Sequence, residues 1–201
     1  PGETSRSAVW AGDLLVVGAE WWLRAFDGFG VPKWEQPAPG PVFALTSTPD
    51  GRVVVAAYGD GTIRWHRGSD GRELVAALPL ADRERWVAWT PWGYYSTSVG
   101  GEAFLGWHVN RTDADAADFF GASQFRDRFL KPGLLPLVVE ALDEATALAK
   151  LDAAARPPPP VATTLPAVLE LVSPGPRVET NAEVLSVKVR VRLQPGDKLS
   201  R

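Results

Sequence analysis

The chain has 201 residues, a formal net charge of −3 and no cysteine or methionine. Apolar residues make up 45% and charged residues 22%, which is typical of globular chains and excludes wholesale disorder. The small charge without a basic block gives no electrostatic reason to expect nucleic-acid or membrane binding, and the missing cysteines exclude a disulfide framework and a thiolate nucleophile within these residues.

The N-terminal region contains two strand-like runs, Leu14–Val17 and Leu23–Asp27, on either side of a turn that carries Trp21 and Trp22. Adjacent aromatic side chains in such a turn cannot both face inward, so we expect one of them to be exposed. An exposed tryptophan is a candidate anchor for a protein partner. The alternative is that it packs beneath a neighbouring loop.

Residues 41–78 form four strand-like runs separated by three turns rich in Gly, Asp and Pro. Val53–Ala57 is a run of β-branched and small residues, typical of a central strand covered on both faces. Thr62–Trp65 is the predicted next strand, and Glu73–Leu78 the outermost. The pattern predicts one meandering antiparallel sheet.

Partial copies of this meander lie on both sides of it, at shifts of 39 to 42 residues. The first copy consists of the two N-terminal runs, and the third of Val87–Tyr95 with Leu105–His108 as its third strand. The period is close to the roughly 40 to 45 residues of a WD-repeat propeller blade, which this region resembles, although His66-Arg67 replaces the family's Trp-Asp. We therefore predict the last two to three blades of a WD-repeat-type β-propeller. Propellers have about four to eight blades, so we expect the chain to be an interior piece of a longer protein.

The histidines of these copies, His66 and His108, have no third metal ligand at useful spacing, and we expect a structural role or a place at the rim for both. No catalytic residue, metal ligand or cofactor site is predicted. Neither a Gly-x-Ser-x-Gly elbow nor a phosphate loop occurs in the sequence.

After residue 112 the hydrophobic period becomes helical. We predict a short helix over Asp118–Phe129 and a longer one over Leu135–Ala154. Arg126 and Arg128 lie on the first helix and are candidates for clamping a partner carboxylate, although solvated helix arginines are common. The second helix has one polar stripe, so its apolar surface should be covered by the bottom or flank of the propeller, with phenylalanines as wedges. The stripe and the wedges are Glu140, Asp143, Glu144, Lys150, Phe119, Phe120 and Phe125.

A proline-rich segment, Arg156–Pro160, follows and predicts a stiff domain boundary. Beyond it, Val168–Val172 reads as a strand, and Glu183–Leu193 alternates apolar and polar residues as a half-buried strand does. We interpret these strands as the start of an immunoglobulin-like β-sandwich. The predicted organisation is propeller blades at 1–112, a helical connector at 113–155, a linker at 156–164 and the sandwich start at 165–201.

The segments that follow the meander resemble the end of the propeller region in bacterial multidomain proteins with a caspase-like peptidase domain. The residues that carry the resemblance are Trp86–Pro91, Gly93–Tyr95, Gly106–Arg111 and Ala122–Phe129. In that family a proline-rich linker, an immunoglobulin-like module and the peptidase follow. The resemblance implies that this chain is a noncatalytic part of a cysteine protease, which senses or positions partners for the peptidase. We expect a cytoplasmic location.

Two alternatives to this interpretation are open. One is a stand-alone WD-repeat scaffold protein without protease activity, and the other is an enzyme in its own right. The expected partners are proteins: the peptidase and the remaining blades in cis, and an unknown protein in trans. Neither nucleic acid nor membrane is expected to bind.

Overall fold

The computed structural model describes residues 2–110, 117–153, 156–159, 165, 168–175 and 177–192. Within them the fold is mainly β, as predicted, with antiparallel sheets and three short α-helices. The chain divides into two compact units, Pro1–Pro157 and Pro158–Arg201, at the proline-rich segment. The finer division into four segments stays a prediction. Linker residues 160–164 and Leu193 lie outside the described residues.

The first unit begins with a four-stranded antiparallel meander, here called the N-terminal sheet, in which each strand pairs with the next along the chain. Apolar residues alternate along its central strands, so that Val16, Leu23 and Ala25 are fully buried on one face. Its strands are β1 (Ser5–Ala11), β2 (Leu14–Ala19), β3 (Trp22–Phe26) and β4 (Pro32–Pro37).

A six-stranded antiparallel sheet follows, here called the central sheet. Its first four strands are the predicted meander of residues 41–78, and two shorter strands extend it. The strands are β5 (Val42–Ser47), β6 (Val53–Tyr58), β7 (Ile63–Arg67), β8 (Glu73–Pro79), β9 (Trp86–Trp89) and β10 (Tyr95–Thr97).

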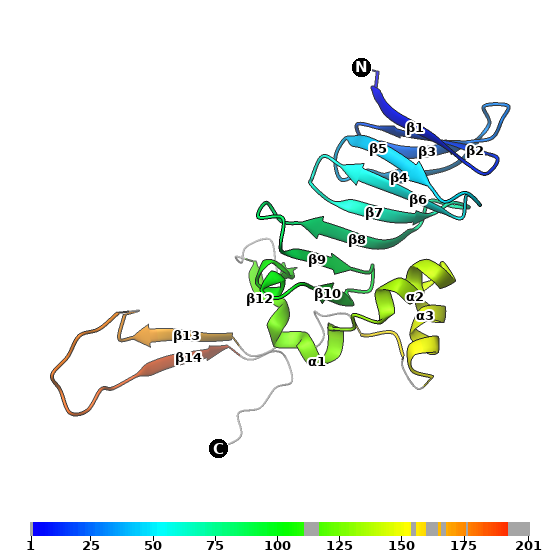
Figure 1. The fold of residues 1–201 in the computed structure, drawn as a ribbon. Coiled ribbons are helices and arrows are strands. Elements are labelled where there is room, and N and C mark those ends of the chain that lie inside the picture. The colour runs from blue at the N-terminus through cyan, green and yellow to red at the C-terminus, as the bar shows by residue number, and fades with distance from the viewer. Residues whose placement is uncertain are drawn as a thin grey trace. The chain divides into compact units, whose positions relative to one another are not determined.

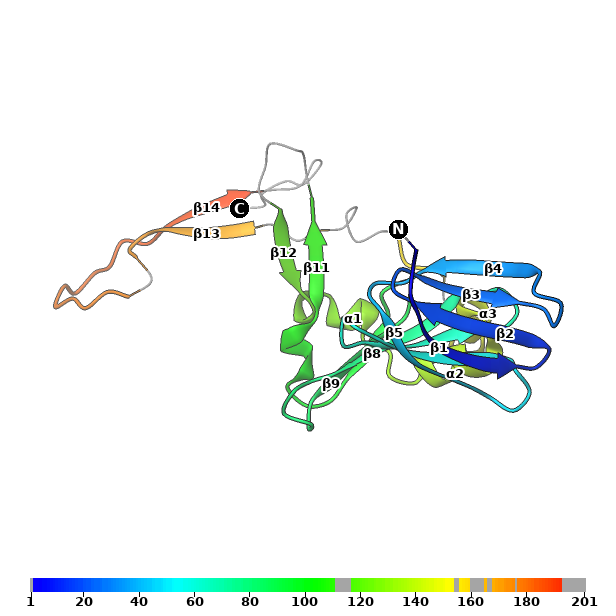
Figure 2. The ribbon, with the colours of Figure 1, turned by 90° about the horizontal axis from the view of Figure 1, so that it is seen from above.

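The two sheets pack face to face, as neighbouring blades of a propeller do (Figures 1 and 2). The core between them contains the buried residues Ala11, Val16, Leu23, Ala25, Val42, Val54, Ala56 and Tyr58. Polar contacts fix the register of the stack, because Trp34 Nε1 donates to the Gly68 carbonyl at 3.0 Å and Gln36 Nε2 to the Asp70 carbonyl at 3.1 Å. The two stacked sheets therefore share one continuous core, with hydrogen bonds at its margin.

The expected third copy does not form a blade of its own. β9 pairs with β8 and extends the central sheet, so the prediction that Glu73–Leu78 is an outermost strand was wrong. The reason is the short connection between them, in which Leu80 N donates to the Arg85 carbonyl and closes a tight turn. A turn of this kind places the next strand beside the last one in the same sheet.

The predicted third strand of that copy also pairs elsewhere. β11 (Gly106–Val109) forms a hairpin with β12 (Asp118–Gly121), the segment where the sequence predicted the start of a helix. Cross-strand pairing places Trp107 opposite Phe120, and these contacts outweigh the helical period. A 3-10 turn, Ala122–Phe125, and a single turn of helix α1, Arg126–Phe129, complete the segment.

The long helix expected over Leu135–Ala154 is a pair of helices, α2 (Leu134–Ala141) and α3 (Glu144–Leu151). The break lies at Leu142, whose backbone is left-handed with φ 57°, and at Asp143, which caps α3 by accepting a hydrogen bond from Thr146 N at 2.8 Å. Asp143 is thus a capping residue rather than part of a polar stripe. The sequence analysis missed this because Asp143 also fits a helical period.

The helix pair packs against the central sheet, as expected for its apolar surface, through contacts between α2 and β8 (Figure 1). Arg67 Nη1 also donates to the Leu142 carbonyl at 3.1 Å. Of the predicted wedges, Phe120 and Phe125 are buried, whereas Phe119 is 64% exposed because it lies on the outer face of the β11–β12 hairpin.

The second unit contains an antiparallel hairpin of β13 (Val168–Ser173) and β14 (Lys188–Arg192). β13 extends one residue beyond the predicted strand Val168–Val172, and β14 is shorter than the alternating run that suggested it. The interpretation as an immunoglobulin-like module stays a prediction. Across both units, none of the described helices has the length and apolar character needed to cross a membrane.

Candidate protein-binding surfaces

Trp21 and Trp22 have different surroundings, as their adjacency required. Trp21 lies in the turn between β2 and β3 and is 61% exposed, while Trp22 opens β3 and is half-buried. The turn is held by Glu3, which accepts a hydrogen bond from Trp21 N at 2.7 Å and forms an ion pair with Arg24 at 2.6 Å. The Arg24 guanidinium in turn lies 5.4 Å from the centre of the Trp22 ring. Trp21 is therefore displayed on an anchored turn.

The charges around this turn are matched. Burial raises the pKa of Glu3, but hydrogen bonds from Arg24 and from Trp21 N outweigh it, and the pKa is lowered overall. Arg24 also pairs with Glu35 at 3.3 Å. Arg24 is therefore paired with two carboxylates, and the exposed Trp21 ring is the distinctive feature of this end of the sheet.

A second aromatic side chain lies at the same end of the stacked sheets. Phe43, near the start of β5, is 59% exposed beside the β6–β7 turn at Gly59. At the opposite end, Phe29 in the β3–β4 turn is 95% exposed. Sequence reasoning named neither phenylalanine, since exposure at a strand end depends on which neighbouring turn covers it.

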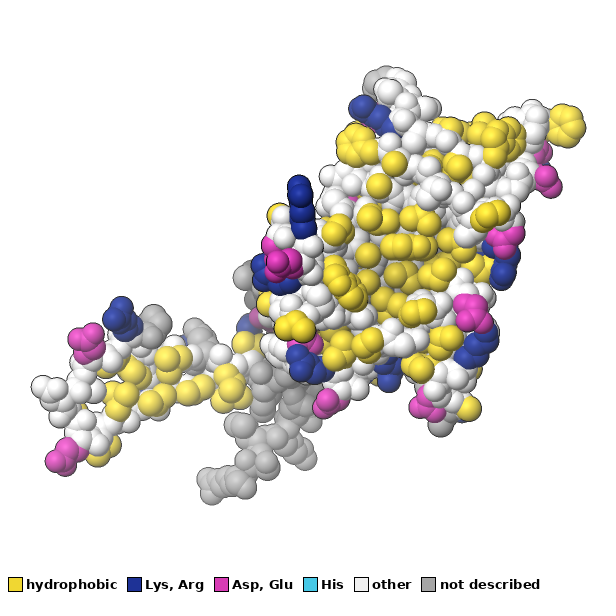
Figure 3. Space-filling model, viewed as in Figure 1, with side chains coloured by type: hydrophobic (Ala, Val, Ile, Leu, Met, Phe, Trp, Pro, Cys, Tyr) yellow, Lys and Arg dark blue, Asp and Glu magenta, His cyan; other side chains and the backbone are white. Residues whose placement is uncertain are grey.

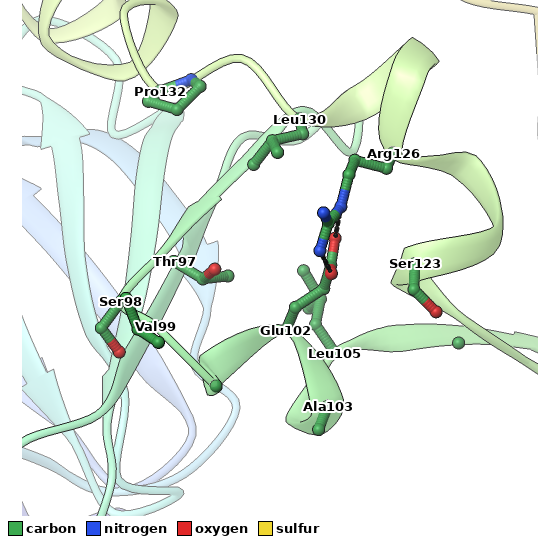
Figure 4. Close-up of a pocket in the computed structure, with 12 residues that line it drawn as sticks. Thr97, Ser98, Val99, Glu102, Ala103, Leu105, Ser123, Arg126, Leu130 and Pro132 are labelled. Carbon is green, nitrogen blue, oxygen red and sulfur yellow. Dashed lines mark hydrogen bonds and ion pairs between the residues drawn. The ribbon is translucent and has the colours of Figure 1, made fainter.

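Arg126 lies at a cavity of about 710 Å³ between the 3-10 turn Gly101–Phe104 and helix α1 (Figure 4). Its guanidinium forms a two-point ion pair with Glu102, which also accepts a hydrogen bond from the Tyr95 hydroxyl. Arg126 holds the pKa of Glu102 below its usual range, and burial raises that of Tyr95. A partner carboxylate at Arg126 would have to compete with Glu102.

Arg128, the other predicted arginine, lies with its guanidinium 4.7 Å from the centre of the Phe129 ring. Both arginines belong to α1, whereas Trp21 and Trp22 belong to the N-terminal sheet, so the four predicted residues do not form one site. The role of the arginines in partner binding stays a prediction.

His66 is built into the core of the central sheet. It is buried, and its ring nitrogens contact the Tyr58 hydroxyl at 2.8 Å and the Gly71 carbonyl at 2.9 Å. Burial lowers the pKa of His66, so the ring is neutral at pH 7. This agrees with the structural role favoured from sequence. Among the described residues, no group of three His, Cys, Asp or Glu side chains could hold a metal ion.

Glu144 is a buried carboxyl group that sequence analysis placed on the polar stripe of the second helix. It is 7% exposed, and its Oε2 accepts a hydrogen bond from Trp92 N at 3.2 Å. Burial raises its pKa to about 7, although the Trp92 N–H and the nearby Thr90 side chain act in the opposite direction. Glu144 Oε1 and Thr90 Oγ1 are both buried without a hydrogen-bond partner among the described residues.

The turn that Glu144 contacts has a close counterpart in the chain. In Thr48-Pro49-Asp50-Gly51 the turn's own Asp50 accepts hydrogen bonds from Thr48 Oγ1 and Arg52 N. In Thr90-Pro91-Trp92-Gly93, Trp92 replaces that aspartate, and the carboxylate comes from α3 instead. The sequence shows that this turn lacks the aspartate of its counterpart, but not that Glu144 lies beside it.

Comparison with known proteins gives similarity to solved structures only. No family model and no curated protein matches the chain. The computationally designed Ika8 protein is 18% identical at a TM-score of 0.32, over 43% of this chain and 33% of that one. BamB from Moraxella catarrhalis is 17% identical at 0.34, over 47% and 34%. The Cps50 (Swd1) β-propeller domain of Myceliophteria thermophila is 15% identical at 0.37, over 48% and 40%. The chain thus spans 33–40% of the length of these structures.

Proposed function

We propose that the first unit is a noncatalytic protein-binding module whose contact surface is the end of the stacked sheets that carries Trp21. The observation that carries this proposal is the exposure of Trp21 on a turn held by Glu3 and Arg24. Exposed aromatic side chains on rigid turns bind partners at low entropic cost, because the backbone that carries the ring is already ordered before the partner arrives. Phe43 extends the apolar area at the same end.

The resemblance to caspase-like proteins supports a finer proposal: that the module belongs to a larger cysteine protease and positions partners for its peptidase domain. The alternative is a stand-alone WD-repeat scaffold. The coding sequence downstream of Arg201 distinguishes the two, because the protease requires a His and a Cys on α/β elements. Their absence would contradict the finer proposal and leave the scaffold.

The binding surface can be tested by affinity capture with quantitative mass spectrometry. We expect Trp21→Ala to reduce recovery of specific partners at least tenfold relative to the unmodified chain, since hot-spot tryptophans contribute about 2 kcal/mol or more. Phe29→Ala is the matched control, because it removes an even more exposed aromatic ring at the opposite end. Equal recovery of partners by Trp21→Ala and the unmodified chain, with circular dichroism unchanged, would contradict the proposal.

A further inference from the structure

The N-terminal sheet and the first four strands of the central sheet are copies of one another, residue pair by residue pair. In β2–β3 the pairs Leu15↔Phe26 and Val17↔Arg24 face each other. In β6–β7 the corresponding pairs are Val54↔His66 and Ala56↔Arg64, at a shift of 39 or 40 residues. The two sheets therefore share one register in their central strands.

The irregularities of pairing recur at the same places. A register shift separates Ser5 from Ser7 in β1, and another separates Val42 from Ala44 in β5. Between the third and fourth strands, the shift at Ala25/Phe26 recurs at Trp65/His66. Because β-bulges set the local twist of a sheet, sheets with the same bulges have the same shape.

Equivalent positions nevertheless have opposite surroundings. Val54 and Ala56 are fully buried between the sheets, whereas their counterparts Leu15 and Val17 lie half-exposed on the outer face of the N-terminal sheet. Conversely, Val16 is fully buried, and its counterpart Val55 is half-exposed on the outer face of the central sheet. Each open face is thus a copy of the face that the other sheet uses in the internal interface.

Both open faces are apolar over much of their area, and Figure 3 shows hydrophobic side chains gathered over the central sheet. Helix α2 reaches one end of that sheet, where Val53 and Val75 are buried. The residues left partly or fully accessible on its outer face are Ala44, Val55, Ala57, Ile63, Trp65 and Ala77. Those on the outer face of the N-terminal sheet are Ala8, Trp10, Leu15, Val17, Trp22 and Phe26.

The charged groups on the two faces also correspond. In the internal interface, Arg64 is partly buried and pairs with Glu73 at 2.7 Å and Asp60 at 3.1 Å. Its counterpart on the open face, Arg24, is likewise paired with two carboxylates. Docking a sheet on this face would therefore bury neutralised charges, as the internal interface already does, and no lone cation would lose its hydration.

We propose that the outer face of the N-terminal sheet binds the outer face of the central sheet of a second copy of this chain, repeating the internal interface between molecules. Such a contact is head-to-tail, since two different faces meet, and it can continue until a ring closes. This goes beyond the proposed partner binding at Trp21, which lies on a turn rather than on either face, and it places a second copy where the sequence analysis expected further blades in cis.

Two single variants test the faces separately. Ala8→Glu places a charge on the outer face of the N-terminal sheet, at the counterpart of Leu45, which packs against the core of the internal interface. Ala44→Glu places one on the outer face of the central sheet, at the counterpart of Ser7, whose Oγ donates to the Val42 carbonyl across the internal interface. Both alanines are exposed, so the fold should tolerate either change.

The measurement is sedimentation velocity on the full chain over a hundredfold range of concentration. We expect the unmodified chain to form dimers or larger species, each variant alone to dissociate at least tenfold more readily, and an equimolar mixture of the two to form a dimer and nothing larger. The mixture retains one intact pair of faces, which is why it stops at two copies. Phe29→Ser, away from both faces, should associate like the unmodified chain.

The outcomes that overturn the proposal are distinct. A chain that stays monomeric throughout would show that these faces do not bind a second copy. Association abolished by Ala44→Glu but unaffected by Ala8→Glu would indicate a symmetric contact between two central sheets. A mixture that stays monomeric would likewise exclude the head-to-tail contact. None of these results bears on partner recovery through Trp21, so the two proposals fail independently.

Discussion

The N-terminal sheet and the first four strands of the central sheet share their register and bulges but differ in what surrounds them. The N-terminal sheet ends at four strands, whereas the central sheet continues through β9 and β10 and is contacted by the helix pair. The comparison teaches that a repeated pattern determines the sheet and its two apolar faces, but not which face is buried. Paired positions in the two copies therefore make matched experiments.

The largest difference in stability between the two sheets should come from placing a charged side chain at the equivalent positions Val16 and Val55. Val16→Asp should cost about 4 kcal/mol or more, because the carboxylate would be buried between the sheets without a partner. Val55→Asp, its counterpart on the open face, should cost about 1 kcal/mol or less. Urea unfolding at low protein concentration measures both, and equal losses would show that the two faces do not differ as described.

The next largest difference in stability between the two sheets should come from adding or removing a single methyl group at equivalent positions. Gly18 corresponds to Ala57, and a Cβ at Gly18 would lie 2.5 Å from Val42 Cγ1 and 2.8 Å from Ser7 Oγ. We expect Gly18→Ala to cost about 2–3 kcal/mol through overpacking. The reciprocal change, Ala57→Gly, lies on the open face and should cost about 1 kcal/mol or less. A neutral Gly18→Ala in the same unfolding assay would mean that the sheets can separate locally at little cost.

The two Thr-Pro-x-Gly turns should respond to pH in opposite directions. The pKa of Glu144 is raised to about 7, so the native state binds this proton more tightly than the unfolded chain does. Its contribution to stability is complete below pH 4.5 and is lost as the pH rises through 7. Glu144→Gln should therefore raise the stability above pH 7 by roughly 2 kcal/mol, with little change at pH 4.

Asp50 is the matched residue in the other turn. The Thr48 hydroxyl and Arg52 N lower the pKa of Asp50, so its contribution is present above pH 3.8 and is lost as the pH falls through the lowered pKa. Asp50→Asn should then reduce the stability of the protein at neutral pH. The loss of stability with rising pH that Glu144 causes should remain. The melting temperature of each variant from pH 3 to 8 measures both effects. A Glu144→Gln protein that is less stable than the unmodified chain above pH 7 would contradict the raised pKa of Glu144.

The smallest effect concerns His66, whose counterpart in the N-terminal sheet is Phe26. His66→Phe leaves the Tyr58 hydroxyl buried without its partner and should cost about 1–2 kcal/mol. In the double variant Tyr58→Phe/His66→Phe the unpaired hydroxyl is gone, so the loss should fall below about 1 kcal/mol. Thermal unfolding measures both, and a double variant that loses as much stability as His66→Phe, or more, would show that the two side chains do not act as a pair.

Sequence reasoning located the meander of residues 41–78, the preceding copy and the mainly β fold correctly, since turn residues and strand periodicity are local signals. It was wrong about the third copy because Val87–Tyr95 has the same local pattern as a new blade, while the tight turn at residues 80–85 keeps it in the existing sheet. It was wrong about Asp118–Gly121 for a similar reason: cross-strand aromatic contacts outweigh a helical period of four residues.

For the candidate surfaces, the sequence alone determined that Trp21 and Trp22 could not share one environment and that His66 suited a structural place, because both follow from side-chain chemistry and strand geometry. Only the tertiary structure decided that Arg126 is paired with Glu102, that Glu144 is buried and accepts a hydrogen bond from Trp92 N, and which face of each sheet is open. These contacts join residues 24 or more positions apart, and the energy of burying a group depends on what packs against it, which periodicity along the chain does not contain.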